Sequence, residues 1–411
     1  MRAKRVRSRR ELKAFIDLAP ELAARRGDTD HYVPLFTSDI AQWHTHSGWF
    51  NEDVELWLIV DESGAPVART ICHSSPELAA KIAASERPAR PTSDDVMPTN
   101  TTDTTDPAGE ASLGRPSTLF FGALEAADAE ALDHLIAHIG FRADQLGARR
   151  VFGPVSPLPN VTGGMLTAGT DRPGFFDTAW NPAFYADSFH AAGFASWGPA
   201  QTWEVEVGSI PAARATAVTE AEWEASGLRR RRISRFGLPA FVRRLLPTLN
   251  AAFAQLPYYT QISTAQLKSQ MQGLTALMDP ELIIDIAEIK DSSETPSRCF
   301  ALVIPDPLPV LRRHGGRLGP SAILDLLVHR HELRDAVLII QGTDPDFQGR
   351  GILSMAIRDL NSALCAKGYR RLRVTFIAED NPASAAVFER SGGEPMHSLS
   401  FFDRHLDGRR R

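Results

Sequence analysis

The chain has 411 residues, of which 43% are hydrophobic and 23% are charged, and its formal net charge at pH 7 is −5. This length and composition are ordinary for a soluble globular protein and allow two domains. The slight acidic excess argues against a nucleic-acid surface, which needs an excess of Lys and Arg on one face. No run approaches the roughly eighteen apolar residues of a membrane span, and no apolar segment follows the charged N-terminus as in a signal peptide. We therefore expect no nucleic-acid partner, no membrane span and a cytoplasmic location.

The first half of the chain predicts strands and helices on either side of a polar insertion. Apolar runs at 55–60 and 66–72 flank a Gly-containing turn and are typical of a β-hairpin. Residues 85–116 are rich in Pro, Thr, Asp and Ser, so we expect a disordered surface insertion there. The hydrophobic pattern then predicts a strand at 118–124, a helix at about 127–145 and a strand at 149–155.

The second half predicts a similar series. Helical patterns at about 236–254 and 264–278 precede strands at 282–288 and 299–304. The remaining predicted elements are a buried strand from residue 337, a helix ending near 367, a strand at 372–378 and a helix led by Asn381.

Cysteine and histidine spacing indicates neither a disulfide framework nor a metal centre. The three cysteines, Cys72, Cys299 and Cys365, lie far apart in the sequence, which suits a reducing compartment. His44 and His46 are separated by one residue, but no third ligand lies near them in the sequence. We therefore expect no metal cofactor.

The turn that follows the strand at residue 337 has the composition of a phosphate cradle. Gly349 and Gly351 stand immediately before a predicted helix, and the N–H groups of residues 349–353 would be free at its N-terminus, which attracts anions. The spacing does not fit a Rossmann turn, and no Gly-Lys-Ser or Gly-Lys-Thr follows as in a P-loop. The alternative is a Gly-rich turn that only joins a strand to a helix.

Two segments in this order resemble motifs of the GCN5-related N-acetyltransferase superfamily. Residues 348–352, Gln-Gly-Arg-Gly-Ile, are similar to its acyl-CoA pyrophosphate loop, and residues 381–393 are similar to its Asn-led helix ending in a glycine turn. The resemblance implies an α/β fold with a mixed β-sheet flanked by helices. Residues 181–194 repeat the composition and spacing of 381–393, so the chain is similar to bacterial proteins with tandem acetyltransferase-like halves.

This resemblance implies a division of the chain into two domains. We expect a degenerate acetyltransferase-like domain at 1–207, a boundary near 208–225 and an acyl-CoA-binding domain at 220–411. Residues 125–130 of the first domain contain no Gly-rich turn. That copy is therefore expected to have lost cofactor binding.

The resemblance also implies an N-acyltransferase that moves an acyl group from acetyl-CoA or another acyl-CoA to a small-molecule or peptide amine. Glu379 is the implied catalytic base, and the alternative is that the Glu-Asp-Asn run it begins caps the next helix. The implied acyl-CoA-binding residues are Gln341, Thr343, Gln348, Gly349, Arg350, Gly351, Ile352 and Asn381. The pattern specifies neither the acceptor nor the oligomeric state.

Two residues depart from the superfamily pattern. Phe388 stands where many members have a tyrosine acid, and a phenyl ring cannot protonate sulfur, while Leu353 replaces a usual Gly or Ala. A non-catalytic module that binds acyl-CoA, or acts through partner contacts, therefore remains an alternative. A second alternative is an aminoacyl or peptidoglycan precursor as acceptor, in the chemistry that uses aminoacyl-tRNA, against which the intact loop at 348–351 argues.

Overall fold

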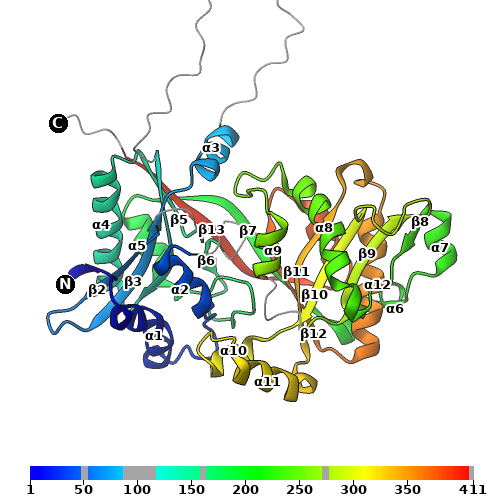
Figure 1. Ribbon diagram of the computed structural model, residues 1–411, viewed down its shortest axis with the longest axis horizontal. Coiled ribbons are helices and arrows are strands. Elements are labelled where there is room, and N and C mark those ends of the chain that lie inside the picture. The colour runs from blue at the N-terminus through cyan, green and yellow to red at the C-terminus, as the bar shows by residue number, and fades with distance from the viewer. Residues whose placement is uncertain (48–53, 87–116, 158–162, 271–276, 407–411) are drawn as a thin grey trace, which may run out of the picture.

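The computed structural model describes residues 1–47, 54–86, 117–157, 163–270 and 277–406 (Figure 1). The polar insertion expected at 85–116 therefore lies almost entirely outside the described residues, as do residues 271–276 of the helix expected at 264–278, whose last two residues are described and are not helical. Within the described ranges the fold is a mixed β-sheet flanked by helices, which confirms the predicted fold class.

The strands and helices follow one another along both halves of the chain. The strands are β1 Arg2–Arg5, β2 Glu55–Val60, β3 Pro66–His73, β4 Thr118–Ala126, β5 Arg150–Gly153, β6 Met165–Ala168, β7 Ala195–Glu206, β8 Leu228–Arg230, β9 Ile283–Glu288, β10 Cys299–Pro305, β11 Asp335–Thr343, β12 Arg371–Ala378 and β13 Glu394–His405. The helices are α1 Arg9–Arg26, α2 Thr37–Thr45, α3 Pro76–Ser85, α4 Ala129–Leu146, α5 Phe184–Ala191, α6 Ala212–Ala215, α7 Glu220–Ala225, α8 Leu238–Phe253, α9 Thr264–Gln270, α10 Leu308–Arg313, α11 Pro320–Val328, α12 Ile352–Lys367 and α13 Pro382–Glu389. Among these elements, β1, β6 to β8, β13, α1 to α3, α6, α7, α10 and α11 were not predicted from the sequence.

One sheet runs through both halves of the molecule. Its strand order is β1-β2-β3-β4-β5-β13-β7-β12-β11-β10-β9-β8, and β6 pairs with β13. The last strand of the chain, β13, lies against β5 of the first half, whereas β7 lies against β12 of the second half. Figure 1 shows β7 and β13 crossing the middle of the molecule together. Each half thus contributes a strand to the other, and the centre of the sheet is built from distant parts of the sequence.

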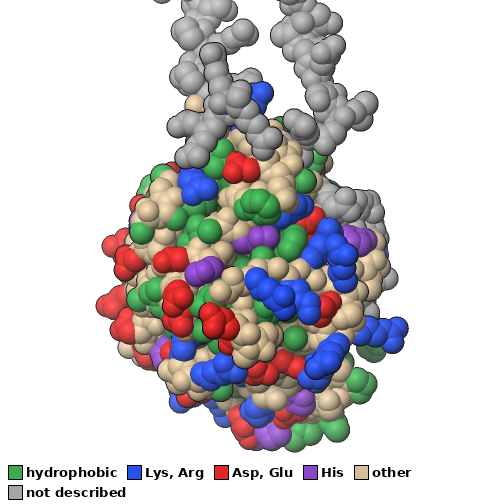
Figure 2. Space-filling model, turned by 90° about the vertical axis from the view of Figure 1, so that its left-hand side faces the viewer, with side chains coloured by type: hydrophobic (Ala, Val, Ile, Leu, Met, Phe, Trp, Pro, Cys, Tyr) green, Lys and Arg blue, Asp and Glu red, His purple; other side chains and the backbone are tan. Residues whose placement is uncertain are grey.

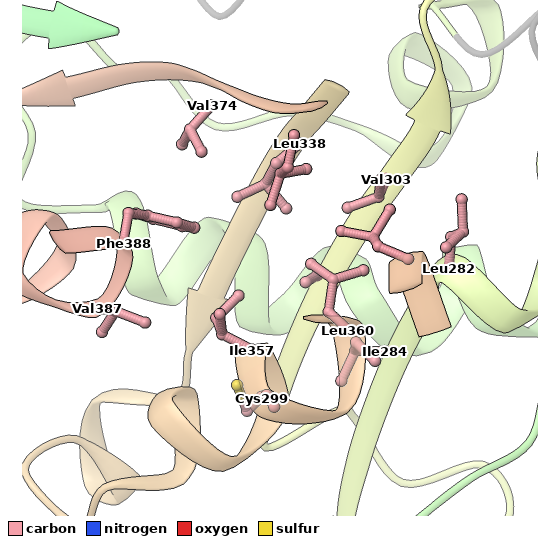
Figure 3. Close-up of a cluster of buried hydrophobic side chains, with 14 of the residues drawn as sticks. Leu282, Ile284, Cys299, Val303, Leu338, Ile357, Leu360, Val374, Val387 and Phe388 are labelled. Atoms are coloured by element: carbon pink, nitrogen blue, oxygen red, sulfur yellow. The ribbon is translucent and has the colours of Figure 1, made fainter. Parts of the chain in front are cut away.

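The sheet of the second half is buried on both faces. Along β10, Cys299, Ala301 and Val303 point to one side, and Phe300, Leu302 and Ile304 point to the other. This alternation is the period of two expected of a strand, and burial on both sides explains why the sequence reads as a continuous apolar run. Helices α12 and α13 cover the first face, whose core is drawn in Figure 3, and α8 covers the second.

Hydrogen bonds between the two halves hold the segment that follows α8, which lines the site described below. Lys81 of α3 donates through Nζ to the carbonyls of Ala254 and Tyr259, at 3.1 Å and 2.7 Å. Arg312 of α10 donates through Nε to the carbonyl of Tyr32 at 2.9 Å. The first half therefore holds the segment that follows α8.

Buried charge also stabilises the second half. Asp285 of β9 is fully buried, accepts two hydrogen bonds from Arg244 at 3.1 Å and 2.7 Å, and pairs with Arg231 at 3.1 Å. Ser297 donates to its other oxygen at 2.8 Å. Asp285 lies in the protein interior and the two guanidinium groups are mostly buried, so each depends on the others for compensation.

Charged side chains of both signs lie on the surface of the first half (Figure 2). Figure 2 shows the end of the molecule formed by the first half, where acidic and basic side chains both occur among hydrophobic ones. Across the described ranges, no helix combines the length and the apolar character needed to traverse a bilayer. Within those same ranges, no group of three or more His, Cys, Asp and Glu side chains is placed to hold a metal ion.

Candidate acyl-CoA site

The site begins where two parallel strands separate. β11 and β12 are paired from Asp335 opposite Arg371 to Leu338 opposite Val374. Beyond that point β11 continues to Thr343 and β12 to Ala378 without pairing with each other. The two strands therefore form an open V whose inner edges carry backbone groups that the ladder does not use.

Irregular pairing on both outer sides accompanies this separation. Opposite β10, the register of β11 shifts so that Ile339 has no partner between Leu338 and Ile340. The pairing of β12 with β7 shifts between Val374 and Ile377. Such bulges bend a strand and increase its twist. Where the two strands begin to separate, the hydroxyl of Thr375 on β12 donates to the carbonyls of Leu338 and Ile339 on β11, at 3.2 Å and 3.1 Å. These hydrogen bonds hold the closed end of the V together.

A glycine turn leads from β11 into α12. Gly349 and Gly351 have φ values of 76° and 75°, in the left-handed region that favours glycine. A Cβ on either residue would meet no atom within 4 Å, so it is the backbone conformation and not crowding that requires glycine here. No side chain caps the start of α12 within the described structure, and its first turn contains no acidic residue. The free N–H groups of this turn are suited to an anion.

The corresponding helix of the first half has the opposite electrostatics. Its N-cap, Asp128, accepts a hydrogen bond from the N–H of Ala131 at 2.9 Å. A carboxylate therefore already occupies the N-terminus of α4, where it would repel a phosphate. This arrangement gives a physical reason for the expected loss of cofactor binding in that half.

A cleft of about 730 Å³ joins the V, the glycine turn and the opposite wall. One side is made of β11, β12, the start of α12, and α13; the other is the segment after α8. Asp177 and Thr178 extend the lining into the first half, and Phe401 of β13 closes one wall. The cleft is thus formed by both halves of the chain.

Most of the predicted site residues lie together in this cleft. The lining includes Gln341, Thr343, Gln348, Gly349, Gly351, Ile352 and Asn381. Arg350 is outside the lining: its guanidinium lies 4.6 Å from the ring centre of Phe347 and donates to the carbonyl of Asp346 at 2.8 Å. Glu379 is also outside, exposed at the end of β12, whereas its neighbour Asp380 lines the cleft. The functional roles assigned to these residues stay predictions.

Two polar side chains of the cleft differ in how their hydrogen bonds are used. Asn381 caps α13 by accepting from the N–H of Ser384 at 3.2 Å, as the capping alternative foresaw. Gln341 instead has a buried Oε1 atom with no hydrogen-bond partner among the described residues. A buried acceptor without a partner costs free energy, so the Gln341 amide is suited to a donor supplied by a ligand.

Basic side chains lie near the glycine turn that the motif did not indicate. Arg214 donates to the hydroxyl of Ser354, in the first turn of α12, at 3.1 Å. Asn361 donates to the carbonyl of Arg214 and to the hydroxyl of Ser391, at 3.2 Å and 3.1 Å, which places α6 beside the end of α13. The exposed Arg390, next to Ser391, lines the cleft. The sequence analysis missed both arginines: Arg214 lies in the short helix α6, outside the two motifs, and Arg390 lies within 381–393, where the resemblance implied only Asn381 as a binding residue.

Phe388 does not face the cleft. It is fully buried and packs in the core beneath α12, where Figure 3 shows its ring directed into the same cluster as Leu338 and Ile357. Tyr258, in the segment after α8, lines the cleft and has its ring centre 5.1 Å from that of Phe376 on β12. Burial raises the pKa of the Tyr258 phenol, and the charge of Asp380 adds to this effect. The Tyr258 hydroxyl is therefore protonated and available as a donor.

Comparison with known proteins identifies the fold. No protein-family model matches the sequence, and no curated protein matches it. The structure is similar to a tandem GNAT protein from the clavulanic acid biosynthesis pathway, at 11% identity and a TM-score of 0.53 over 98% of each chain. The chain has the tandem GCN5-related N-acetyltransferase fold.

A second solved structure supports the same fold. A GCN5-related glucosamine N-acetyltransferase region of a fungal multi-domain GH3 β-N-acetylglucosaminidase is 12% identical, with a TM-score of 0.50. That match covers 98% of this chain and 38% of the fungal one. The tandem acetyltransferase fold thus spans nearly the whole chain, including the strands exchanged between its halves.

Proposed function

We propose that the protein is an acyl-CoA-dependent N-acyltransferase, with acetyl-CoA or another acyl-CoA as donor and an amine as acceptor. The observation that carries the proposal is the continuity of one cleft from the uncapped N-terminus of α12 into the open V between β11 and β12. A phosphate-binding turn and a row of unused strand groups are what an elongated, phosphorylated thioester requires. The tandem acetyltransferase fold supports the same conclusion.

The residues of the cleft divide between the two ends of such a donor. The N–H groups at the start of α12 and the guanidinium of Arg390 are suited to its phosphates. The amide of Gln341 and the edge of β11 that no longer pairs with β12 are suited to the amide groups of its pantetheine arm. Charge and hydrogen-bonding capacity thus fit the donor along the length of the cleft.

In the proposed transfer, the amine nitrogen attacks the thioester carbonyl carbon, so that a C–N bond forms and the C–S bond breaks. The nitrogen loses one proton and the sulfur leaves as a thiolate. Asp177 and Asp380 both line the cleft, and Asp380 is the one that follows β12 at the open V. We therefore assign Asp380, in place of Glu379, to accept the amine proton directly or through water. We assign no acid to the sulfur, because a thiol is a weak enough base to leave as a thiolate that water then protonates.

A calorimetric titration with acetyl-CoA tests the donor site, and release of free thiol in the presence of amines tests the transfer. The proposal expects micromolar binding by the wild-type chain and none by Gly351→Glu, which places a bulky negative charge in the turn. It also expects thiol release that Asp380→Asn lowers at least tenfold without changing donor affinity. Absence of binding by any thioester would remove the basis of the proposal.

A non-catalytic acyl-CoA-binding protein is the second candidate, and the burial of Phe388 favours it. With a phenyl ring in the core, the helix that carries the tyrosine acid in many superfamily members presents no proton donor to the cleft. This candidate predicts donor binding that Gly351→Glu abolishes, together with no thiol release above the spontaneous rate for any amine. The same pair of measurements therefore separates the two functions.

A further inference from the structure

One wall of the cleft is made of aromatic rings that come from three distant segments. We call Tyr258, Phe376 and Phe401 the aromatic wall; they belong to the segment after α8, to β12 and to β13. The ring centre of Tyr258 lies 5.1 Å from that of Phe376 and 5.6 Å from that of Phe401, and the last two are 6.1 Å apart. All three rings line the cleft. They are therefore a single packed surface and not isolated side chains.

Further aromatic rings and a lysine from the first half hold the aromatic wall in place. Trp197 packs against Tyr258 and Phe401, with ring centres 6.4 Å and 5.9 Å apart. Phe401 also stacks on Phe152, at 5.5 Å. Lys81 holds the segment that carries Tyr258 through its bonds to the flanking carbonyls. A surface supported in this way is preorganised, so a ligand that uses it does not have to order it.

The position of the aromatic wall assigns it to the acceptor. Phe376 lies on β12 just beyond Val374, the last residue that pairs with β11, and so stands at the open V where the thioester is expected. The phosphate-binding end of the cleft, by contrast, is marked by Gly351 and Arg390. The amine has to meet the thioester at the open V, and the rings line the cleft there, so we assign them to the amine and not to the phosphates.

The charge at this end of the cleft is suited to an amine. Asp380 lies close enough to Tyr258 for its charge to affect the phenol. Leu399 and Ile339 extend the apolar lining beside the rings. An ammonium group is attracted by a carboxylate and by the faces of aromatic rings, whereas a body rich in hydroxyl groups would lose its hydration against such a wall.

From these contacts we propose that the acceptor is a primary amine attached to an apolar body of aromatic-ring size, an arylalkylamine, and that the aromatic wall binds this body. The inference rests on the proposed function, because the acceptor is defined by transfer to an amine. It differs from that function in naming the chemical class that the cleft selects. Sugar amines and small hydroxylated amines are predicted to be poor acceptors.

The test compares 2-phenylethylamine and tryptamine with glucosamine and ethanolamine. Binding of each amine is measured by calorimetry with and without acetyl-CoA, and transfer is followed by thiol release. We expect kcat/KM at least tenfold higher for the two arylalkylamines. The Phe376→Ala and Tyr258→Ala variants should raise KM for 2-phenylethylamine at least fivefold and leave acetyl-CoA affinity unchanged. Tyr258→Phe should retain the wild-type KM, because it keeps the ring.

Phe236→Ala is the matched control for loss of a phenyl ring, because Phe236 is 97% exposed and lies outside the cleft. Equal use of all four amines, or unchanged amine preference in both wall variants, would overturn the inference while acetyl-CoA binding kept the proposed function intact. Failure to bind acetyl-CoA together with tight binding of the arylalkylamines would support the aromatic wall and overturn the proposed function. Failure of both bindings would overturn both.

Discussion

Replacing Gly351 by alanine tests the phosphate cradle with a single methyl group. At its φ of 75°, a Cβ would project into space that holds no atom within 4 Å, next to the free N–H groups of α12. The left-handed conformation costs a residue other than glycine about 1–2 kcal/mol in folding free energy. A methyl group in the path of a phosphate should remove at least one to two charge-assisted hydrogen bonds, each contributing about 1.5–3 kcal/mol. We therefore expect acetyl-CoA affinity to fall by about 3 kcal/mol, roughly a hundredfold in Kd.

Gly227 provides the control for backbone strain. It has a φ of 74° and open space around its Cβ position, as Gly351 has, but lies between α7 and β8, outside the cleft. Both alanine variants should lose a similar free energy of unfolding in urea, because the same conformation is strained in each. Only Gly351→Ala should lose affinity in a calorimetric titration with acetyl-CoA. Equal affinities for the two variants would refute the assignment of α12 as the phosphate-binding helix.

Three further predictions follow from contacts away from the glycine turn. Lys81→Met removes two hydrogen bonds to the segment after α8, so steady-state kinetics should show that the KM for the amine rises about threefold to tenfold while the Kd for acetyl-CoA is unchanged. A matching change in the Kd for acetyl-CoA would contradict a local role of Lys81. Asp285→Asn leaves two mostly buried guanidinium groups without their counter-ion, so urea unfolding should show a loss of about 3–5 kcal/mol. Glu294→Gln breaks an exposed pair and should cost at most about 1 kcal/mol, so similar losses in the two variants would refute the argument. Burial lowers the pKa of His397 from its ordinary 6.5 to about 4, so between these pH values the unfolded chain binds more protons than the folded one. The free energy of unfolding should therefore fall as pH decreases through that window, by about 3 kcal/mol for this residue. His397→Gln should reduce this pH dependence, and an unchanged profile would show that the imidazole is not buried as described.

The parts of the site that the sequence predicted are those fixed by local chain chemistry. Two glycines before a helix determine a left-handed turn, and an Asn-Pro pair determines the start of α13, whatever surrounds them. These elements appear where they were predicted, and Gly349, Gly351 and Asn381 line one cleft. The hairpin formed by β2 and β3 was predicted for the same reason, since its turn and its alternating pattern are local.

The parts that were not predicted depend on the exchange of strands between the halves. Phe401 lies in the cleft because β13 crosses to pair with β5, and no local pattern specifies that pairing. Tyr258 lies there because Lys81, from the other half, holds its segment. The position of Arg350 outside the lining reflects its contact with Phe347, a choice of rotamer that the motif does not encode.

The two halves of the chain differ in what they contribute to the cleft. We propose that residues 220–411 hold the donor and that residues 1–207 support the acceptor side. The capped N-terminus of α4 favours this division, because Asp128 fills the position that a phosphate would take. The contribution of Asp177 and Thr178 to the cleft is consistent with a role for the first half in closing it.

A crystal structure of the protein with bound CoA tests the central claim most directly. The account predicts pyrophosphate oxygens within hydrogen-bond distance of the N–H groups of residues 349–353, and a pantetheine arm between β11 and β12 that reaches the amide of Gln341. It also predicts no CoA at the N-terminus of α4. Density for CoA elsewhere on the molecule, with the V between β11 and β12 filled by side chains or solvent, would contradict it.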